Sequence, residues 1–389
     1  MRISSLIIGV TLAWAVAVLP ASAWAQESGL FVIRGLKIDR TAESATKARE
    51  EAIAEGQIDA FRRLYERLVP SFELGRMPNL TADQIQSYVL DYSVENEKTS
   101  SVRYLADFSV RFQAEEIRSL LQSSGINFAI TQSKPVLVLP LYGNENHVRL
   151  WQEPNYWLRA WSHRFSEDRL VPLVVPLGDL SDLSAIDADA VMRGDLDRIR
   201  QMAYRYGAED TLITQALISG NLGDGTARLQ VVSRRIDAYQ QAMQLTLKQG
   251  NGESLDALLA RAAEAVDAQV QEKWKLANLL DFSDRRFMAV SVETLQLGDW
   301  LAIRQRLADI VTVESVQVTR LSRGWTEIDL AFVGDEERLT VAMAQRDLLL
   351  TPRYDGRWEL RLDPTVARPA AGARGKDGSA STESGLNSQ

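Results

Sequence analysis

The apolar run PVLVLPLY at residues 135–142 limits the fold of this chain more than any other feature. A strand without polar residues on either side needs both faces covered, as in a sheet packed between two layers of helices. Residues 170–177, LVPLVVPL, predict a second strand of this kind. A helix is expected in 150–165 after Pro154, and another at 195–206. With a strand at 210–218, the order of elements indicates an α/β layer.

The same segment, 134–281, continues with strands expected at 226–236 and 239–248. A long helix follows, because apolar residues recur at helical spacing from Leu255 to Trp274. This segment is expected to form one α/β domain.

The preceding segment, 29–131, begins with an alternating strand at 31–38 and then changes period. Small residues recur at three- and four-residue steps at Ala45, Ala48, Ala52 and Gly56, which predicts a helix lying tight against a sheet. Two alternating runs (88–94 and 102–112) predict a hairpin, and a second helix is expected at 114–121. The order βαββα indicates an α+β domain.

The third segment, 284–363, has the periodicity of a ferredoxin-like βαββαβ domain. Its expected helices are 298–307 and 335–344, and its expected strands are 287–292, 311–321, 326–332 and a final pair at 348–352 and 357–362. The chain is therefore expected to be an α+β and α/β protein of three small mixed domains.

The composition of both ends of the chain indicates segments that lie outside these domains. Residues 1–25 combine Arg2, a 14-residue apolar run and small residues before Gln26, which predicts a signal peptide cleaved after Ala25. An uncleaved anchor is the alternative. Residues 364–389 are rich in Ala, Gly, Ser and Pro and are expected to form a disordered tail. No later stretch approaches 18 apolar residues, so no transmembrane span is expected in the mature chain.

The amino-acid composition excludes several kinds of functional site. There is no cysteine, which excludes disulfides, thiolate metal sites and a lipoprotein acylation site. With only two histidines, a multi-histidine metal site is excluded, so neither metal nor cofactor is expected. The net charge of −8 argues against nucleic acid as a partner. Export without cysteine is compatible with the bacterial periplasm.

Two patterns match catalytic or metal-binding motifs only in part. Ser44 and Lys47 match the S-x-x-K motif of penicillin-recognising serine enzymes, but its companion motifs are missing, and a polar helix face is the preferred interpretation. The acidic stretch 179–197 lacks the ligand spacing of a calcium loop. Its acids are interpreted as a solvated loop and as charges at helix N-termini. Whether the chain is an enzyme stays open, with the balance against it and no catalytic residue identified.

The densest local feature is a group of aromatic residues within eleven positions. Trp157 and Trp161 are four residues apart and share a helix face, with Trp151 and Tyr156 close by and Asn155 in position to cap the helix. Such rings stack on sugars or pack against apolar neighbours. Packing against the sheet is the preferred interpretation, and a glycan-binding site is the alternative.

Several of these elements resemble an uncharacterised family of secreted proteobacterial proteins. The resemblance rests on the helix 48–68, on VLVLP at 136–140, on NYWLRAW at 155–161 and on GAED at 207–210. The last segment adds Gly298-Asp299-Trp300 and Gly334-Asp335. The middle segment also resembles the amino-terminal domain of TolB and the curli secretion channel, which are envelope assembly and binding folds. The resemblance implies no activity and no catalytic residues.

Together these observations predict a periplasmic, non-enzymatic binding or assembly factor of the cell envelope. It would contact an envelope protein, through exposed strand edges in the first and third segments. A glycan- or peptidoglycan-binding module using the tryptophans is one alternative. The other is a hydrolase that uses paired carboxylates or Ser44 and Lys47.

Overall fold

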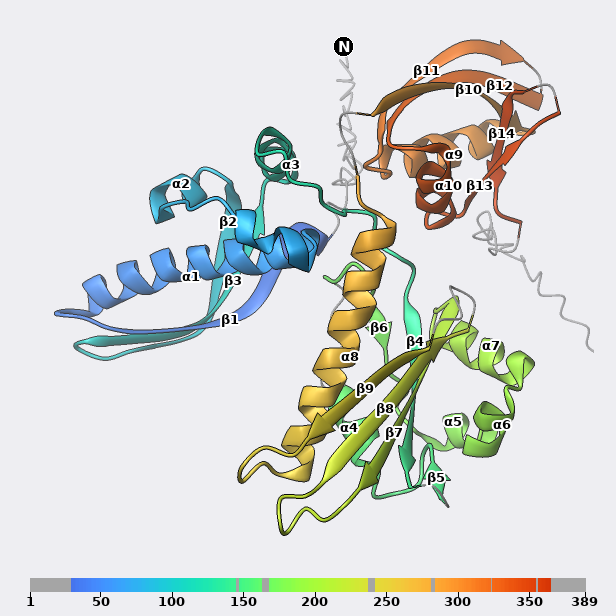
Figure 1. Ribbon diagram of the computed structural model, residues 1–389. Helices are drawn as coiled ribbons and strands as arrows, with labels where there is room; N and C mark the ends of the chain where they lie inside the picture. Colours follow the sequence, from blue (N-terminus) through green and yellow to red (C-terminus); the bar gives the residue numbers. More distant parts are fainter. Residues whose placement is uncertain are drawn as a thin grey trace, which may run out of the picture. The chain divides into compact units, whose positions relative to one another are not determined.

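The computed structural model describes residues 29–144, 147–162, 168–236, 242–280, 284–322, 324–354 and 356–364 (Figure 1). The predicted signal peptide lies outside the described residues, as does the predicted tail after Pro364. The chain is an α+β protein with several small sheets, and it divides into two compact units at Leu280. The first two predicted segments lie in the first unit, so the three-domain division stays a prediction.

The first unit begins with a three-stranded antiparallel sheet in the order β1-β3-β2. Its strands are β1 (Val32–Thr41), β2 (Val89–Thr99) and β3 (Arg103–Phe112), and the predicted hairpin is the pair β2–β3. Helix α1 (Ala45–Leu68) packs on β1 and β3. Short helical segments surround this layer: η1 (Gly29–Phe31), η2 (Ser71–Arg76), α2 (Ala82–Gln86) and α3 (Ala114–Ser123).

The small-residue stripe of α1 does bring the helix close to the sheet. A Cβ added at Gly56 would lie 2.8 Å from Cδ1 of Phe108 and 2.9 Å from Cγ2 of Ile38. Ala48, Ala52 and Ala60 on the same helix are buried. The sequence prediction of a tight helix-on-sheet contact is confirmed.

A mixed six-stranded sheet forms the rest of the first unit, with the order β5-β4-β7-β8-β9 and β6 paired to β4. Strands β4 and β7 are parallel, whereas β7, β8 and β9 form an antiparallel meander. The strands are β4 (Val136–Gly143), β5 (Val148–Arg149), β6 (Leu173–Val174), β7 (Asp210–Ser219), β8 (Arg228–Arg235) and β9 (Met243–Lys248).

Helices cover both faces of this sheet, as the apolar run at 135–142 predicts. Val136 and Val138 join the core under α4 (Tyr156–Ser162) and α8 (Leu255–Ala277). Leu137 and Leu139 point to the opposite core, under helices α5 (Leu180–Ala185), α6 (Ala188–Arg193) and α7 (Leu196–Arg205).

The strand expected at 170–177 is wrong in length. Only Leu173 and Val174 pair with β4, as β6. Pro172 and Pro176 flank this pair, and proline has no N–H to donate to a neighbouring strand. The helix expected in 150–165 after Pro154 begins at Tyr156, as α4, and its described part ends at Ser162.

The two sheets of the first unit are joined where α1 and α8 end. The buried ammonium of Lys275 donates to the carbonyl oxygens of Glu66 at 3.0 Å and Val69 at 2.8 Å. Glu272 accepts from both the backbone N–H and the hydroxyl of Ser71, each at 2.8 Å. The carbonyl oxygens in the last turn of a helix have no hydrogen-bond partner within that helix. The ammonium of Lys275 at the end of α8 supplies this partner at the C-terminal end of α1, where a positive charge is also favoured by the helix dipole.

The second unit is a five-stranded sheet in the order β11-β12-β10-β14-β13. Strands β10, β12 and β11 pair antiparallel, as expected for a ferredoxin-like sheet. The last hairpin departs from that prediction, because β14 lies between β10 and β13 and pairs parallel with β10, which leaves β13 at the edge. The elements are β10 (Arg285–Thr294), α9 (Leu297–Ala308), β11 (Val313–Ser322), β12 (Gly324–Val333), α10 (Glu336–Ala344), β13 (Leu348–Pro352) and β14 (Trp358–Leu362).

Both helices of the second unit contribute to a single core. Ile303 and Leu307 of α9 and Leu339 and Met343 of α10 pack with the inner side chains of β10 and β12. Across the described ranges, none of the helices is both long and apolar enough to cross a membrane.

Candidate functional site

The tryptophans singled out by the sequence lie in the core. Trp151, Trp157 and Trp161 expose 7%, 0% and 0% of their surface. The indole N–H of Trp151 donates to the carbonyl of Ile186 at 2.6 Å, and that of Trp157 donates to Thr214 at 3.2 Å. The rings of Trp157 and Trp161 meet edge to face with centroids 5.6 Å apart. These rings pack α4 and its preceding loop onto the sheet, which was the preferred interpretation.

Asn155 and Tyr156 have supporting positions around this packing. Asn155 is fully buried, and its side chain accepts from the N–H of Leu158 and donates to the carbonyl of Leu150. It therefore caps α4, as expected. The ring of Tyr156 is partly buried and lies 4.4 Å from the guanidinium carbon of Arg159. None of the three indoles offers an open face on which a sugar ring could stack.

The Ser44–Lys47 pair has a local structural explanation. Ser44 is the N-cap of α1, and its hydroxyl accepts from the backbone N–H of Lys47 at 3.2 Å. The side chain of an N-cap residue accepts from the backbone N–H three residues later in the chain. The serine and lysine of the S-x-x-K motif have the same spacing. The contact accounts for Ser44 without a catalytic role.

Three acids of the stretch 179–197 are helix caps. Asp179, Asp187 and Asp195 are the N-caps of α5, α6 and α7, and each accepts from a backbone N–H of its own helix. The carboxylate of each stabilises the positive end of a helix dipole. No group of three or more acids or histidines in the described ranges could hold a metal ion.

Asp182 differs from the other acids of that stretch because it is buried. It accepts from the hydroxyl of Tyr206 at 2.7 Å and from the N–H of Gly178 at 2.9 Å. Burial and the bond to Asp182 raise the pKa of Tyr206 to about 12. The phenol stays protonated at neutral pH and holds the loop before α5 in place.

Strand edges are the surfaces that remain for a partner. The central sheet ends on one side in the two-residue strand β5, a common way to limit an open edge. By contrast, β2 has eleven residues and β11 has ten, and each is the outermost strand of its sheet. Among the described residues no further strand pairs with the outer side of either.

β2 combines this open edge with exposed apolar side chains. Leu90 exposes 50% and Tyr92 exposes 45% of its surface. Helix α1 packs mainly on β1 and β3, and the half-exposed ring of Tyr92 contacts that of Phe108 with centroids 5.4 Å apart. An extended partner segment could add backbone hydrogen bonds and place its side chains beside these two residues.

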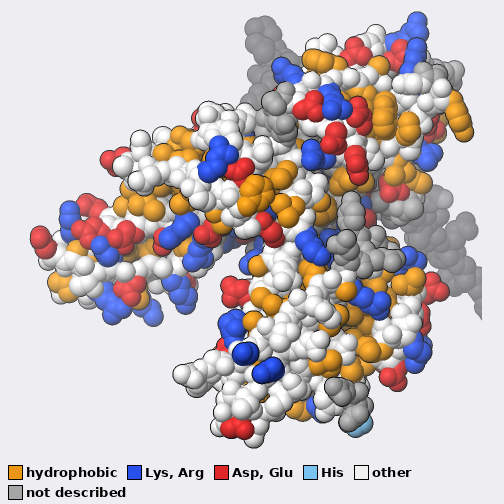
Figure 2. All heavy atoms as spheres, in the orientation of Figure 1, with side chains coloured by type: hydrophobic (Ala, Val, Ile, Leu, Met, Phe, Trp, Pro, Cys, Tyr) orange, Lys and Arg blue, Asp and Glu red, His pale blue; other side chains and the backbone are white. Residues whose placement is uncertain are grey.

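The opposite face of the same sheet is polar and largely satisfied. A shallow hollow there is lined by Arg34, Asp91, Ser93, Glu95 and Arg111, among others. Arg111 forms an ion pair with Asp91, and Arg34 forms one with Asp168. On the face drawn in Figure 2, basic and acidic side chains are interspersed over the surface.

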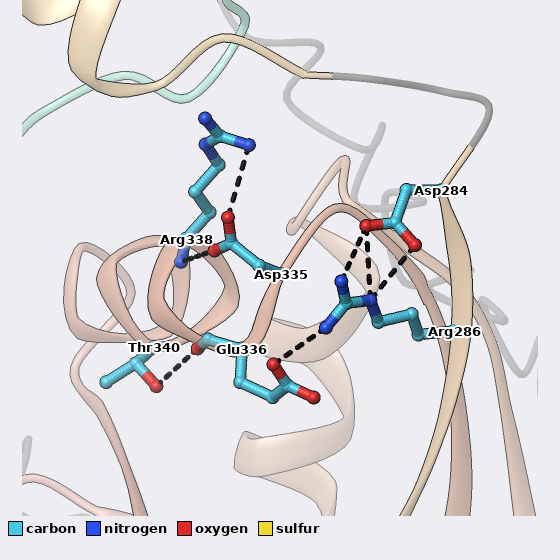
Figure 3. A network of polar contacts seen from close by, with 6 residues as sticks. All are labelled: Asp284, Arg286, Asp335, Glu336, Arg338 and Thr340. Carbon is cyan, nitrogen blue, oxygen red and sulfur yellow. Dashed lines mark hydrogen bonds and ion pairs between the residues drawn. The ribbon is translucent and has the colours of Figure 1, made fainter.

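Two arginines have the charge and the number of polar contacts that are typical of a binding site, but each connects neighbouring elements of the fold. Arg67, near the end of α1, donates to the carbonyls of Leu30 and Val32, and burial lowers its pKa to about 9. In the second unit, Arg286 of β10 bonds both carboxylate oxygens of Asp284 and reaches Glu336 at the start of α10 (Figure 3). We interpret both as structural.

The sequence could not identify β2 as the candidate edge. Its alternating pattern predicts a strand, but the order of strands in a sheet depends on which partners fold against it. The one usable signal is the charged stretch Glu95–Lys98 at its end, since charge is common on edge strands.

Comparison of the chain with protein-family models and with curated proteins gives no match. The resemblance to a secreted proteobacterial family and to TolB-type domains therefore stays a prediction.

Proposed function

We propose that this protein is a periplasmic, non-enzymatic binding or assembly factor of the bacterial cell envelope. In this proposal it binds an extended segment of an envelope protein along the outer edge of β2. The predicted export signal and the absence of cysteine support the location.

The observation that carries the proposal is an eleven-residue edge strand with exposed apolar side chains next to its free backbone groups. Natural proteins usually shorten, bend or charge such edges, because they pair with other chains. The charged part of β2 follows this rule: its pairing with β3 is irregular between Glu95 and Lys98. The part from Asp91 to Val94 is regular and carries Tyr92, so we assign the partner to this part.

The alternatives have less support. The glycan-binding module needs an accessible aromatic platform, and the three tryptophans are buried. The serine-dependent hydrolase needs a free nucleophile, and the hydroxyl of Ser44 caps α1. No observation on the described residues favours a pair of carboxylates arranged for hydrolysis.

Photocrosslinking from the edge tests the proposal in cells. A benzophenone amino acid replaces Tyr92 in one variant and Tyr204 in the control. Tyr204 lies on α7, is more exposed at 81%, and has the same side chain. We expect one identified envelope protein to be captured from position 92 and not from position 204.

The captured protein must then bind the purified chain directly. Tyr92→Lys is expected to weaken this binding at least tenfold because it places a charge on the pairing edge, whereas Tyr204→Lys leaves it unchanged. Equal effects of the two substitutions, or recovery of glycan fragments in place of protein, would overturn the proposal.

A further inference from the structure

Another long edge strand, β11, has a sequence that is complementary to itself. Nine of its residues, VESVQVTRL at 313–321, are arranged almost symmetrically around Gln317. Valine flanks the centre on each side, a hydroxyl residue lies two positions away on each side, and an acid and a base lie three positions away, at Glu314 and Arg320. We propose that β11 is a self-association edge, on which a second copy of this chain pairs antiparallel about Gln317.

This register brings opposite charges together at both ends. Counted outward from Gln317 along two antiparallel copies, Glu314 comes opposite Arg320 of the second copy, just beyond the regular stretch Ser315–Val318, and the two-fold axis repeats the pair. Cross-strand pairs of opposite charge stabilise a sheet, whereas like charges destabilise it. A shift of two residues in either direction separates both charge pairs, so the charges select one register.

The side chains also lie on matching faces. Val316 and Val318 are paired with Leu330 and Ile328 of β12, whose side chains point into the core under the helices. Both valines therefore lie on the helix-covered face. Arg320 is paired with Glu327, and Glu314 forms an ion pair with Arg285, on the other face of the sheet. The apolar and the charged contacts would form on separate faces of the joined sheets.

An exposed apolar strip runs beside this edge. Val318 and Leu321 expose 50% and 73% of their surface although they point to the helix-covered face. On α9, Leu297 and Leu301 expose 74% and 55%. Their helical spacing puts them on the side of α9 opposite Arg306. Arg306 forms an ion pair with Asp347, which directly precedes β13 at the far edge of the sheet from β11. The two leucines therefore lie on the side of α9 toward β11.

The geometry favours a second copy over an unrelated segment as the occupant, because an isologous interface must be complementary to itself. Two irregularities in the pairing of β11 with β12, at Glu314 and Thr319, lie on either side of the central stretch Ser315–Val318 and leave that stretch regular. Figure 1 draws β11 at the outer edge of its sheet. The joined structure would be a continuous sheet with two copies of the α9 strip across the two-fold axis.

Sedimentation equilibrium of the purified protein tests this inference with variants in which the charges at Glu314 and Arg320 are reversed. The parent chain is expected to dimerise reversibly with concentration. Glu314→Arg and Arg320→Glu are each expected to weaken the dimer at least tenfold, because each places like charges opposite one another at both ends. The double variant Glu314→Arg with Arg320→Glu is expected to restore the parent dissociation constant. Arg361→Glu on β14, with the same change of charge at an exposed site, is the control.

A parent chain that stays monomeric at every concentration would overturn the inference, as would a double variant that dimerises no better than the single ones. A cysteine at the two-fold axis gives a second readout, since the chain has none of its own. Gln317→Cys is expected to oxidise to a disulfide-linked dimer faster than Gln305→Cys on α9. Equal rates would argue against pairing at β11. Circular dichroism confirms that each variant is folded.

Discussion

Replacing Gly56 with alanine tests how closely α1 lies on the first sheet. The glycine faces β1 and β3 at the middle of a 24-residue helix. An added methyl group would lie 2.8 Å and 3.1 Å from two ring carbons of Phe108 and 2.9 Å from Cγ2 of Ile38. Phe108 exposes 0% and Ile38 exposes 7% of its surface, so both side chains lie in the core.

Two opposing free-energy terms decide the sign. Alanine is favoured over glycine in a helix interior by about 1 kcal/mol. Forcing an extra methyl into a packed core costs about 1–3 kcal/mol. With three contacts shorter than ordinary van der Waals distance, we take the upper half of that range. The net expectation for Gly56→Ala is a loss of about 1–2 kcal/mol in the free energy of unfolding.

Urea unfolding followed by circular dichroism and tryptophan fluorescence measures this loss as a lower midpoint. Gly298→Ala is the control: it lies in α9, and no atom comes within 4 Å of the added Cβ. It is expected to be neutral or to stabilise by up to about 1 kcal/mol. If Gly56→Ala is as stable as the parent chain, the helix lies farther from the sheet than the structure indicates.

Three further perturbations test the cap, the core and the pH dependence. Asp187→Ala removes the N-cap of α6 and should lower the free energy of unfolding, measured in urea, by about 1 kcal/mol. Asp189→Ala is the control, because Asp189 is not a cap, and it should cost less. Equal losses would contradict the assignment of the cap. Trp157→Ala should cost about 3–5 kcal/mol, and a stability equal to the parent's would show that the ring is not in the core. The bond from Arg261 lowers the pKa of Glu253 from its ordinary 4.5 to about 2, so its stabilisation is complete above pH 4.5 and is lost as the pH falls toward 2. Glu253→Gln should flatten that part of the thermal stability curve, and an unchanged curve would refute the pairing.

Local patterns in the sequence predicted much of the fold because their causes are local. The small-residue stripe at Gly56 predicted a tight helix, and the apolar run at 135–142 predicted a strand buried on both faces. The acids before α5, α6 and α7 predicted charges at helix N-termini. Backbone periodicity and capping depend on neighbours a few residues away, which the sequence states directly.

The candidate sites depend on contacts between distant residues. An indole ring suits both a core and a sugar platform, so the sequence could not decide where Trp157 and Trp161 lie, and the structure places them in the core. The pattern of β2 and β11 predicted strands, but an edge is defined by the neighbour that a strand lacks. The order β1-β3-β2 and the outer position of β11 follow from long-range pairing. By itself the sequence determined most of the longer elements and their buried faces. Only the tertiary structure decided which strands keep an open side for a partner, because backbone hydrogen bonds between strands carry no residue signature.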